Sequence, residues 1–355
     1  MFKKIIVGLL VGMIIMLSQT AAVFASETPK ERASQAIKVL QGWYNPATGI
    51  YDTTGWWNSA NAIYALADYS IKTGSDEYLK LFQNTYALNI GKEFLNNFYD
   101  DEGWWALAWI RVYELTKNEK FLQTAKDIFT DMTTAWDETC GGGLWWSKDR
   151  NYKNAIPNEL FLQVAARLHN HTPNDTVFLD WAQREWTWFK ASGLINENHL
   201  INDGLNKDCK NNEDIPWTYN QGVILGGLIE LHKATGDDAL LTQAQAIADA
   251  AIKILVNEDG ILREPCELSG RCGSDGPQFK GIFMRNLGFL YETTKAQAYA
   301  DFINRNAATL WTKARNSEGQ LGLKWSGPFD RADAARQSSA LEALLAALLP
   351  PSANP

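Results

Sequence analysis

Two kinds of hydrophobic pattern alternate along this chain. In the first kind, apolar residues recur at helical spacing on one face. Between residues 118 and 136, for example, Phe121, Ala125 and Ile128 alternate with lysine, aspartate and glutamine. This pattern is typical of a helix with one buried face and one face in water. We therefore predict amphipathic helices in that segment and in five similar ones: 29–43, 76–97, 174–192, 237–256 and 296–315.

The second kind of segment is apolar on most of its faces. A helix of this composition is buried on both sides. Because these segments alternate with the amphipathic ones, the chain is predicted to be a loose repeat of a helical hairpin. The segments concerned are 56–71, 104–115, 156–168, 217–232, 279–291 and 332–348.

Six such hairpins predict an all-α fold, an (α/α)6 barrel with buried helices in an inner ring and amphipathic helices in an outer ring. An open helical solenoid is the alternative. Closure is favoured because six units are enough to close a ring and because no polar capping repeat is evident. No proline-rich or charged linker divides the chain, so we expect a single catalytic domain over residues 26–355.

The connections between the predicted helices are unequal in length. Short turns such as KTGS, TKNE and ATGD follow the buried helices, whereas long polar and aromatic loops precede them. The long loops therefore collect at one end of the barrel, which is where we expect a ligand cleft. They contain IYDTTGWW, YDDEGWW, GGGLWWSKDRNYKN, LNKDCKNNEDIPWTYN, REPCELSGRCGSDGPQF and LKWSGPFDRAD.

Residues 1–25 have the features of a secretory signal peptide. Lys3 and Lys4 precede an apolar run over residues 5–17, and small residues lead to a predicted cleavage site after Ala25. An uncleaved membrane anchor is the alternative, but the apolar run is short for a bilayer span. We therefore expect a secreted, extracellular protein. The C-terminal tail is polar and contains proline, so no lipid-anchor signal is expected there.

Charge and cysteine usage narrow the possible functions. The formal net charge is −8, and no basic run or patch is present, which argues against nucleic acid or an anionic membrane as a partner.

Export would permit disulfides among the four cysteines. Cys266 and Cys272 could close a small ring and Cys140 and Cys209 could form a second bridge, although the sequence leaves the connectivity open. A zinc site is disfavoured because the spacing does not fit one.

The adjacent carboxylates Asp100 and Asp101 are the first candidates for chemistry. Neighbouring acids in a cleft of low dielectric repel each other, so one keeps its proton while the other ionises. Glycoside hydrolysis needs this division of roles, because one carboxyl group protonates the leaving oxygen and the other attacks carbon or activates water. The alternative is that Asp100-Asp101-Glu102 is only an N-cap and an acidic first helical turn.

Aromatic and amide side chains near the same loops are candidates for binding sugar. Trp-Trp pairs at 56–57, 104–105 and 145–146 stand at or near the starts of buried helices, and indole faces suit the C–H faces of sugar rings. Consecutive tryptophans cannot both face a cleft, so about half of these rings should be core. The amides could equally cap helices. The candidates are Trp56, Trp57, Asn58, Asn61, Trp104, Trp146, Asn154, Asn158, Glu159, Tyr219, Asn220, Gln221, Asp275 and Phe279.

The sequence lacks the signatures of other common chemistries. It contains no G-x-S-x-G, no H-E-x-x-H, no phosphate-binding glycine loop and no dinucleotide fingerprint. We therefore expect neither a metal nor an organic cofactor.

Several blocks of the sequence together resemble glycoside hydrolase family 76, the endo-α-1,6-mannanases. The blocks are WWNSANAIYAL, YDDEGWWALAWIRVYE, GGGLWWSKDRNYKNAIPNELFLQVAARL, YNQGVILGGLIEL, DGPQFKGIFMRNL and RQSSALEALLAAL, and they span nearly all of the mature chain. The resemblance implies an (α/α)6 barrel, a retaining mechanism and a linear α-1,6-mannan substrate. It further implies that Asp100 is the nucleophile and Asp101 the general acid/base. We expect a monomer whose partner is the polysaccharide.

Other activities remain as alternatives. One is a cell-wall mannan transglycosylase, which the family includes, and another is a non-catalytic glycan-binding protein with the same fold. An unsaturated-uronide hydrolase or a sugar epimerase would also use this barrel. An epimerase would need positioned histidines and a uronide enzyme would need basic residues in the cleft, and neither is evident in these loops.

Overall fold

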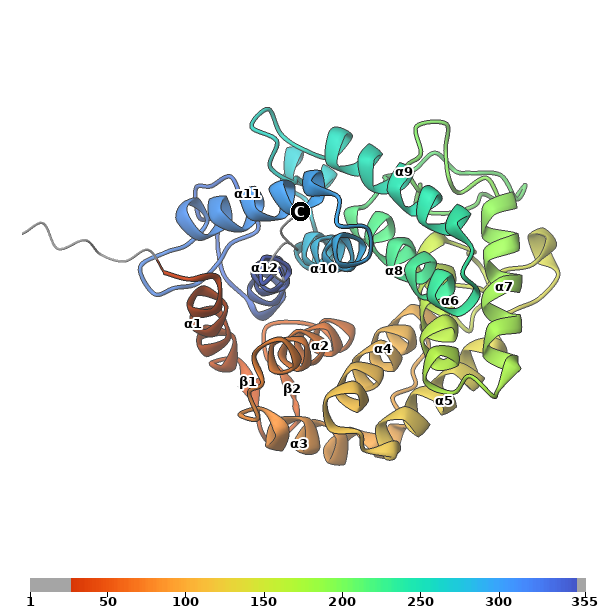
Figure 1. Ribbon diagram of the computed structural model, residues 1–355, viewed down its shortest axis with the longest axis horizontal. Coiled ribbons are helices and arrows are strands. Elements are labelled where there is room, and N and C mark those ends of the chain that lie inside the picture. The colour runs from red at the N-terminus through yellow and green to blue at the C-terminus, as the bar shows by residue number, and fades with distance from the viewer. Residues whose placement is uncertain (1–26, 350–355) are drawn as a thin grey trace, which may run out of the picture.

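The computed structural model describes residues 27–349 and shows two concentric rings of helices (Figure 1). The predicted signal peptide and the last residues of the C-terminal tail lie outside the described residues. The inner ring consists of α2 (Trp56–Thr73), α4 (Tyr99–Thr116), α6 (Ala155–His171), α8 (Thr218–Thr235), α10 (Gly276–Thr294) and α12 (Ala334–Ala346). The outer ring consists of α1 (Pro29–Gln41), α3 (Leu79–Asn89), α5 (Glu119–Thr133), α7 (Thr176–Ala191), α9 (Asp238–Ile254) and α11 (Gln297–Lys313).

The inner ring is closed. Each inner helix packs against the next one along the chain, and α12 packs against both α1 and α2, which joins the end of the described chain to its beginning. The prediction of an (α/α)6 barrel is therefore confirmed, and the open solenoid is excluded.

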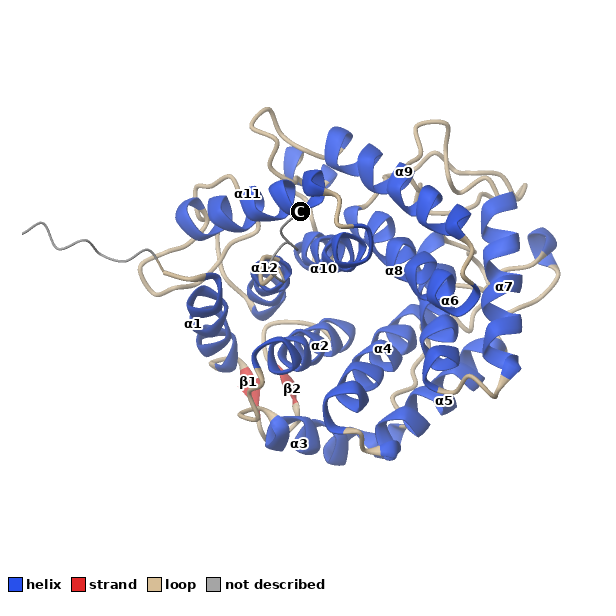
Figure 2. Ribbon diagram, viewed as in Figure 1, coloured by secondary structure: helices blue, strands red, loops and turns tan. Residues whose placement is uncertain are grey.

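Little other regular structure is present (Figure 2). Strands β1 (Tyr44–Asn45) and β2 (Ile50–Tyr51) form a small antiparallel hairpin in the loop before α2, with Tyr44 opposite Tyr51. Three 3-10 helices lie in the connections: η1 (Ile90–Lys92), η2 (Thr139–Gly141) and η3 (Pro265–Leu268).

Burial explains the two hydrophobic patterns. In α6, every residue from Ala155 to His169 is buried, because this helix packs against its neighbours in the inner ring and against the outer ring. In α5, the buried residues instead form a single stripe that faces the core. Gly74 and Gly236 end α2 and α8 with φ of 73° in both cases, and this left-handed conformation allows a tight turn toward the outer ring.

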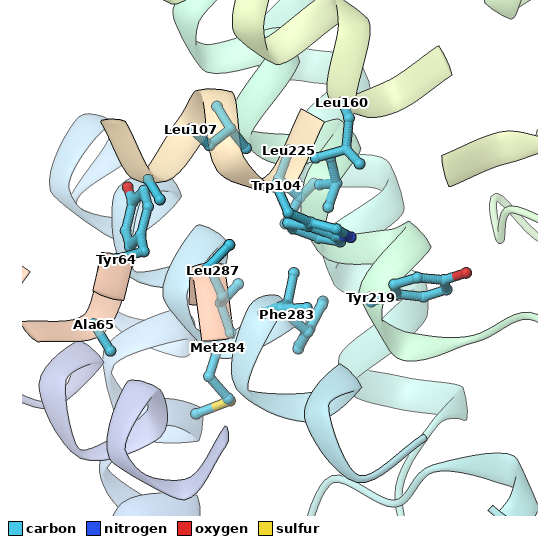
Figure 3. Close-up of a cluster of buried hydrophobic side chains, with 14 of the residues drawn as sticks. Tyr64, Ala65, Trp104, Leu107, Leu160, Tyr219, Leu225, Phe283, Met284 and Leu287 are labelled. Carbon is cyan, nitrogen blue, oxygen red and sulfur yellow. The ribbon is translucent and has the colours of Figure 1, made fainter. Parts of the chain in front are cut away.

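Side chains fill the middle of the barrel, so the ring encloses a core rather than a pore. Figure 3 shows Tyr64, Trp104, Leu225, Phe283 and Leu287 converging from α2, α4, α8 and α10. All five side chains are buried. Burial of this much apolar surface is the main force that holds the inner ring together.

Buried ion pairs join the inner helices nearer their C-terminal ends. The Arg167 guanidinium lies 2.7 Å from the Glu114 carboxylate, and that of Arg285 lies 2.5 Å from the Glu342 carboxylate. Arg111 also pairs closely with Asp68. Burial alone would raise the pKa of Glu114, but the nearby Arg167, together with His171 and Arg111, holds that pKa well below its ordinary range. These charges cross-link α2, α4, α6, α10 and α12.

Both disulfides that the sequence allowed are present. Cys140 is bonded to Cys209, which joins the loop before α6 to the loop before α8. Cys266 is bonded to Cys272 in the loop before α10. Over residues 27–349, no helix combines the length and the apolar composition that a bilayer crossing requires.

Candidate active site

A pocket of about 490 Å³ opens at the end of the barrel where the inner helices begin. Its lining contains four carboxylates, seven aromatic rings and one amide. Among the residues that the structure describes, no lysine, arginine or histidine lines it. The lining residues are Trp57, Phe98, Asp100, Asp101, Trp104, Trp146, Tyr152, Asn154, Asp203, Tyr219, Asp275 and Phe279.

Asp100 and Asp101 lie in the first turn of α4, not ahead of it. The helix begins at Tyr99, and its N-cap is Phe98, which caps through no side chain. The alternative that one of the two aspartates caps the helix is therefore wrong. The Asn96 Oδ1 accepts the Phe98 backbone N–H at 2.7 Å, which fixes the turn that leads into the helix.

The two carboxyl groups have different surroundings. The Asn96 amide donates a hydrogen bond of 2.6 Å to Oδ2 of Asp101. Oδ1 of Asp100, by contrast, is buried and accepts no hydrogen bond from any residue between 27 and 349. A buried oxygen without a donor is costly in an idle side chain, and it is commonly a sign of a functional group.

Burial raises the pKa of both aspartates, and the charge of a nearby carboxylate adds to the rise in each. Burial is the largest cause of the rise for Asp100, the charge of Asp101 adds to it, and the Trp146 indole opposes it. Burial also raises the pKa of Asp101 to about 6, while the Asn96 hydrogen bond lowers it and the charge of Asp275 raises it. The pair therefore loses one proton near pH 6 and holds the second to higher pH, which leaves one acid and one carboxylate at neutral pH.

Four aromatic rings form a continuous floor beside the acids. Trp57, Trp104, Tyr219 and Phe279 come from α2, α4, α8 and α10. Successive ring centroids lie 5.6 Å, 6.5 Å, 3.9 Å and 6.1 Å apart around the set. Figure 3 shows Trp104 and Tyr219 from this floor. Trp146 packs on Phe98 with a centroid distance of 4.8 Å and adds a further wall. Such a floor offers apolar faces to the C–H faces of sugar rings.

Each Trp-Trp pair places one ring in the pocket and turns the other away from it, in agreement with the prediction that consecutive tryptophans cannot both face the cleft. Trp57, Trp104 and Trp146 line the pocket. Trp105 is buried in the core, and the Trp145 indole N–H donates a 2.8 Å hydrogen bond to Asp137. Trp56 was expected to bind substrate, but it packs against Trp105 and Phe94 instead.

Asp275 closes one side of the pocket. Its Oδ1 accepts a 2.9 Å hydrogen bond from the Trp57 indole N–H, which links the start of α10 to the start of α2. This bond fixes the orientation of one ring in the aromatic floor. The same carboxylate raises the pKa of Asp101, so Asp275 also affects the acid pair.

Two hydrogen-bonded side chains in the pocket wall, Tyr152 and Asp203, were not predicted from the sequence, nor was Asn212 behind them. The Tyr152 hydroxyl donates a 2.5 Å hydrogen bond to Asp203, and the Asn212 amide donates one of 2.9 Å to the same hydroxyl. Burial raises the pKa of Asp203, and the Tyr152 hydrogen bond opposes that rise. Tyr152 and Asp203 lie in the long loops that predicted the cleft, but nothing in those loops distinguishes them from other polar residues. Phe98 was also missed, since it looks like an ordinary core residue.

Several predicted binding residues do not reach the pocket, because their polar atoms serve the backbone. Asn58 accepts the Gly55 N–H at 3.1 Å at the start of α2. Gln221 accepts the Ile201 N–H at 2.8 Å and donates to the Ile201 carbonyl at 2.9 Å. Asn158 bonds in the same way to both backbone groups of Leu144. These amides hold the long loops onto the inner helices.

Asn61, Glu159 and Asn220 are also buried away from the pocket. Asn61 accepts a 3.1 Å hydrogen bond from Arg285. Glu159 and Asn220 are 0% exposed, and their side-chain polar atoms bond to no described residue. Burial raises the pKa of Glu159 well above its ordinary range, so this side chain is a neutral acid in the core. Glu159 therefore does not line the pocket, where it was expected to contact substrate.

The sequence is similar to a family model and to several known proteins. The family model described as glycosyl hydrolase family 76 matches residues 28–355. A mannan endo-1,6-alpha-mannosidase of Candida albicans, DFG5, is 29% identical over 279 residues, which are 71% of this chain and 61% of that protein. A putative mannan endo-1,6-alpha-mannosidase of Schizosaccharomyces pombe is 33% identical over 222 residues, or 58% of this chain and 50% of its own length. The chain thus spans about half to two thirds of these relatives.

Several solved structures have a fold similar to that of this chain. The Lin0763 protein from Listeria innocua has a TM-score of 0.82 and 28% identity, with 90% of this chain and 97% of that chain covered. An α-1,6-mannanase from a Salegentibacter species has a TM-score of 0.82 and 25% identity, with 90% and 99% covered. Since the family model matches almost every residue from the start of α1 onward, the chain belongs to glycosyl hydrolase family 76.

Proposed function

We propose that this protein is a secreted, retaining endo-α-1,6-mannanase that acts as a monomer on linear α-1,6-mannan. One observation carries the proposal. Two adjacent acids, one of them with a buried oxygen that has no described donor, lie beside a floor of four aromatic rings in an open pocket. Acids in pairs and aromatic walls are what glycoside hydrolysis requires.

Relatives support the choice of substrate. Several carry the name mannan endo-1,6-alpha-mannosidase. The Salegentibacter mannanase has been crystallised with α-1,6-mannotetrose as an inactive variant in which two consecutive aspartates are replaced. That variant is 26% identical to this chain, and 91% of this chain is covered. We infer that Asp100 and Asp101 correspond in role to that pair.

The charge of the pocket supports a neutral substrate. Four carboxylates line it, and the described part of the chain contributes no cation to it. A uronide or a phosphorylated sugar would bring a further negative charge next to these carboxylates, which is repulsive in a cleft of low dielectric. The pocket therefore favours a neutral mannan over the charged substrates of an unsaturated-uronide hydrolase.

In the proposed cycle, the mannan chain lies with its ring faces against Trp57, Trp104 and Tyr219. The pair holds one proton, which the higher pKa of Asp100 favours on Asp100 in the free enzyme. In the reactive form this proton is on Asp101, which donates it to the leaving glycosidic oxygen while the Asp100 carboxylate attacks the anomeric carbon, so that the glycosidic bond breaks and a mannosyl-enzyme ester forms. Asp101 then removes a proton from water, the water oxygen attacks the same carbon, and the ester bond breaks. Two displacements give net retention. Asn96 positions Asp101 for both proton transfers.

Incubation with linear α-1,6-mannan tests the proposal. We expect short manno-oligosaccharides whose newly formed reducing ends appear first as the α-anomer in the proton NMR spectrum. Asp100→Asn and Asp101→Asn should each lower kcat/KM by at least about a thousandfold while leaving the circular dichroism spectrum unchanged.

Asp238→Asn is the matched control, because Asp238 also stands in a pair of adjacent aspartates at a helix start but is 93% exposed. It should keep full activity. Appearance of the β-anomer first would refute the retaining mechanism. Binding without cleavage would refute the hydrolase, and transfer to an added oligosaccharide in preference to water would identify a transglycosylase.

A further inference from the structure

We propose that a second glycan-binding site lies on the outside of the barrel and takes part of the same neutral polysaccharide chain. The site is a groove of about 580 Å³ between α7 and residues 136–141, which precede α6. We call it the outer groove, and its side walls are formed mainly by Trp136, Glu138, Gln183, Arg184, Thr187 and Trp188. The identity of the polysaccharide rests on the proposed mannanase function.

The lining of the outer groove combines the two features that recognise sugars. Trp136 and Trp188 supply apolar ring edges, and the guanidinium of Arg184 lies over one face of Trp136, 4.4 Å from its ring centroid. Planar polar groups, the Gln183 amide and the Arg184 guanidinium, stand beside these rings on the exposed face of α7. Apolar ring edges beside planar hydrogen-bonding groups fit the C–H groups and the neighbouring hydroxyls of a sugar ring.

The charge of the outer groove fits a neutral ligand. Arg184 pairs with Glu138 at 3.2 Å, so its charge is already balanced. A phosphate or carboxylate ligand would have to compete with Glu138 for the guanidinium, whereas a sugar hydroxyl can share it. A neutral glycan is therefore favoured over an anionic one.

The back of the outer groove is rigid. The Trp188 indole N–H donates a 3.0 Å hydrogen bond to the Cys140 carbonyl, and Cys140 is held by its disulfide to Cys209. At Gly143, φ is 81° and an added Cβ would lie 2.4 Å from the Trp188 ring. The loop thus lies flat against this indole. A preformed wall lowers the entropic cost of binding.

The outer groove and the active-site pocket are neighbours along one loop. Residues 136–141 line the groove, and Trp146, Tyr152 and Asn154 in the same connection line the pocket. Outer helices run opposite to inner ones, so the C-terminal end of α7 lies at the end of the barrel where the pocket opens (Figure 1). A long mannan chain can occupy both sites, whereas a tetrasaccharide can occupy only one. Binding of a long chain at one site then raises its effective concentration at the other site, an advantage that a tetrasaccharide does not have.

Two variants separate this site from the active-site pocket. Gln183→Ala combined with Arg184→Ala removes hydrogen-bonding groups, and Ala191→Trp fills the groove from an exposed position without removing a buried contact. Lys190→Ala is the control, since it removes the same charge from α7 but does not line the groove. Affinity electrophoresis in gels that contain linear α-1,6-mannan measures binding, and kcat/KM is measured on the polymer and on α-1,6-mannotetraose.

We expect both variants to bind mannan in the gel about tenfold more weakly than the wild type. For Gln183→Ala with Arg184→Ala this is the effect of losing one or two net hydrogen bonds, and for Ala191→Trp it is the effect of an indole that occupies the groove. Their KM for polymer should rise by a similar factor, with kcat/KM on the tetrasaccharide unchanged. Lys190→Ala should behave as the wild type. Equal retardation of all proteins, no retardation of the wild type, or equal losses on polymer and tetrasaccharide would each overturn the outer groove as a glycan site. If the wild type binds mannan in an Arg184-dependent manner but cleaves nothing, the second site stands and the mannanase proposal fails.

Discussion

The pH at which activity falls off on the acid side, the acid limb of the pH profile, should shift when either neighbour of Asp101, Asp275 or Asn96, is replaced. The two replacements should shift it in opposite directions. Catalysis in the proposed cycle needs exactly one proton on the Asp100–Asp101 pair, so activity rises as the first proton leaves, with a pKa of about 6. Asp275 raises this pKa because its negative charge disfavours a second one nearby. The Asn96 hydrogen bond lowers it because it stabilises the carboxylate.

The expected magnitudes follow from these contributions. Burial is the largest cause of the rise in the pKa of Asp101 to about 6, and the charge of Asp275 adds to it. For two carboxylates on opposite sides of a wet pocket we take a repulsion of ~0.7 kcal/mol, which corresponds to about half a pH unit. At pH 5 about one eleventh of the wild-type pair has lost its first proton. If the pKa fell by half a pH unit, this singly protonated fraction would rise to about one quarter. Asp275→Asn should therefore increase the relative rate at pH 5 about 2.5-fold. Asn96→Ala should lower it about threefold by the same arithmetic.

The assay is kcat/KM on α-1,6-mannotetraose between pH 4 and pH 9, with each profile scaled to its own maximum. Asp275→Asn keeps an oxygen that can accept the Trp57 indole N–H, so the aromatic floor should stay in place. Asp238→Asn removes an exposed charge and should leave the limb where it is. An acid limb that stays fixed in both variants, or that moves the same way in both, would refute this account of the pair.

Three further predictions concern the floor, the unpredicted carboxylate and the loop disulfide. Trp57→Ala should raise KM for mannan with little loss of stability. Its neighbour Trp56→Ala should lower the free energy of unfolding in urea by about 3 kcal/mol and leave kcat/KM of the folded enzyme nearly unchanged. Asp203→Asn should lower kcat/KM on mannotetraose about tenfold, and activity equal to wild type would remove it from the site. Replacing Cys140 and Cys209 by alanine, which opens a loop with a sequence separation of 69, should lower the free energy of unfolding by about 2–4 kcal/mol, and an unchanged urea midpoint would contradict this.

The fold could be predicted because it depends on a repeated pattern. Each hairpin contributes one helix buried on all sides and one with a single buried stripe, and the difference is visible in the sequence alone. The helix starts were less accurate. The segment expected at 104–115 begins at Tyr99 in α4, because acidic residues in a first helical turn look the same as acidic residues in the loop ahead of it.

The misassigned residues share a physical cause. Successive residues of a helix point about 100° apart, so only some positions at the start of an inner helix can face the pocket. Trp57 faces it while Trp56 and Asn58 do not, and Tyr219 faces it while Asn220 and Gln221 turn away. The sequence alone does not define which face of an all-round apolar helix lies toward the cleft, because every face is apolar.

Tyr152 and Asp203 could not be found by any periodic argument, since they lie on separate loops. Those loops meet as a short antiparallel bridge between Asn154 and Gly204, in which Ala155 donates its N–H to the Asp203 carbonyl at 2.9 Å. An added Cβ on Gly204 would lie 2.3 Å from the Tyr152 hydroxyl oxygen, so only glycine allows the ring to reach Asp203 across the bridge. The contact therefore depends on the pairing of two loops 51 residues apart, which the packing of α6 against α8 brings together and which neither loop determines alone.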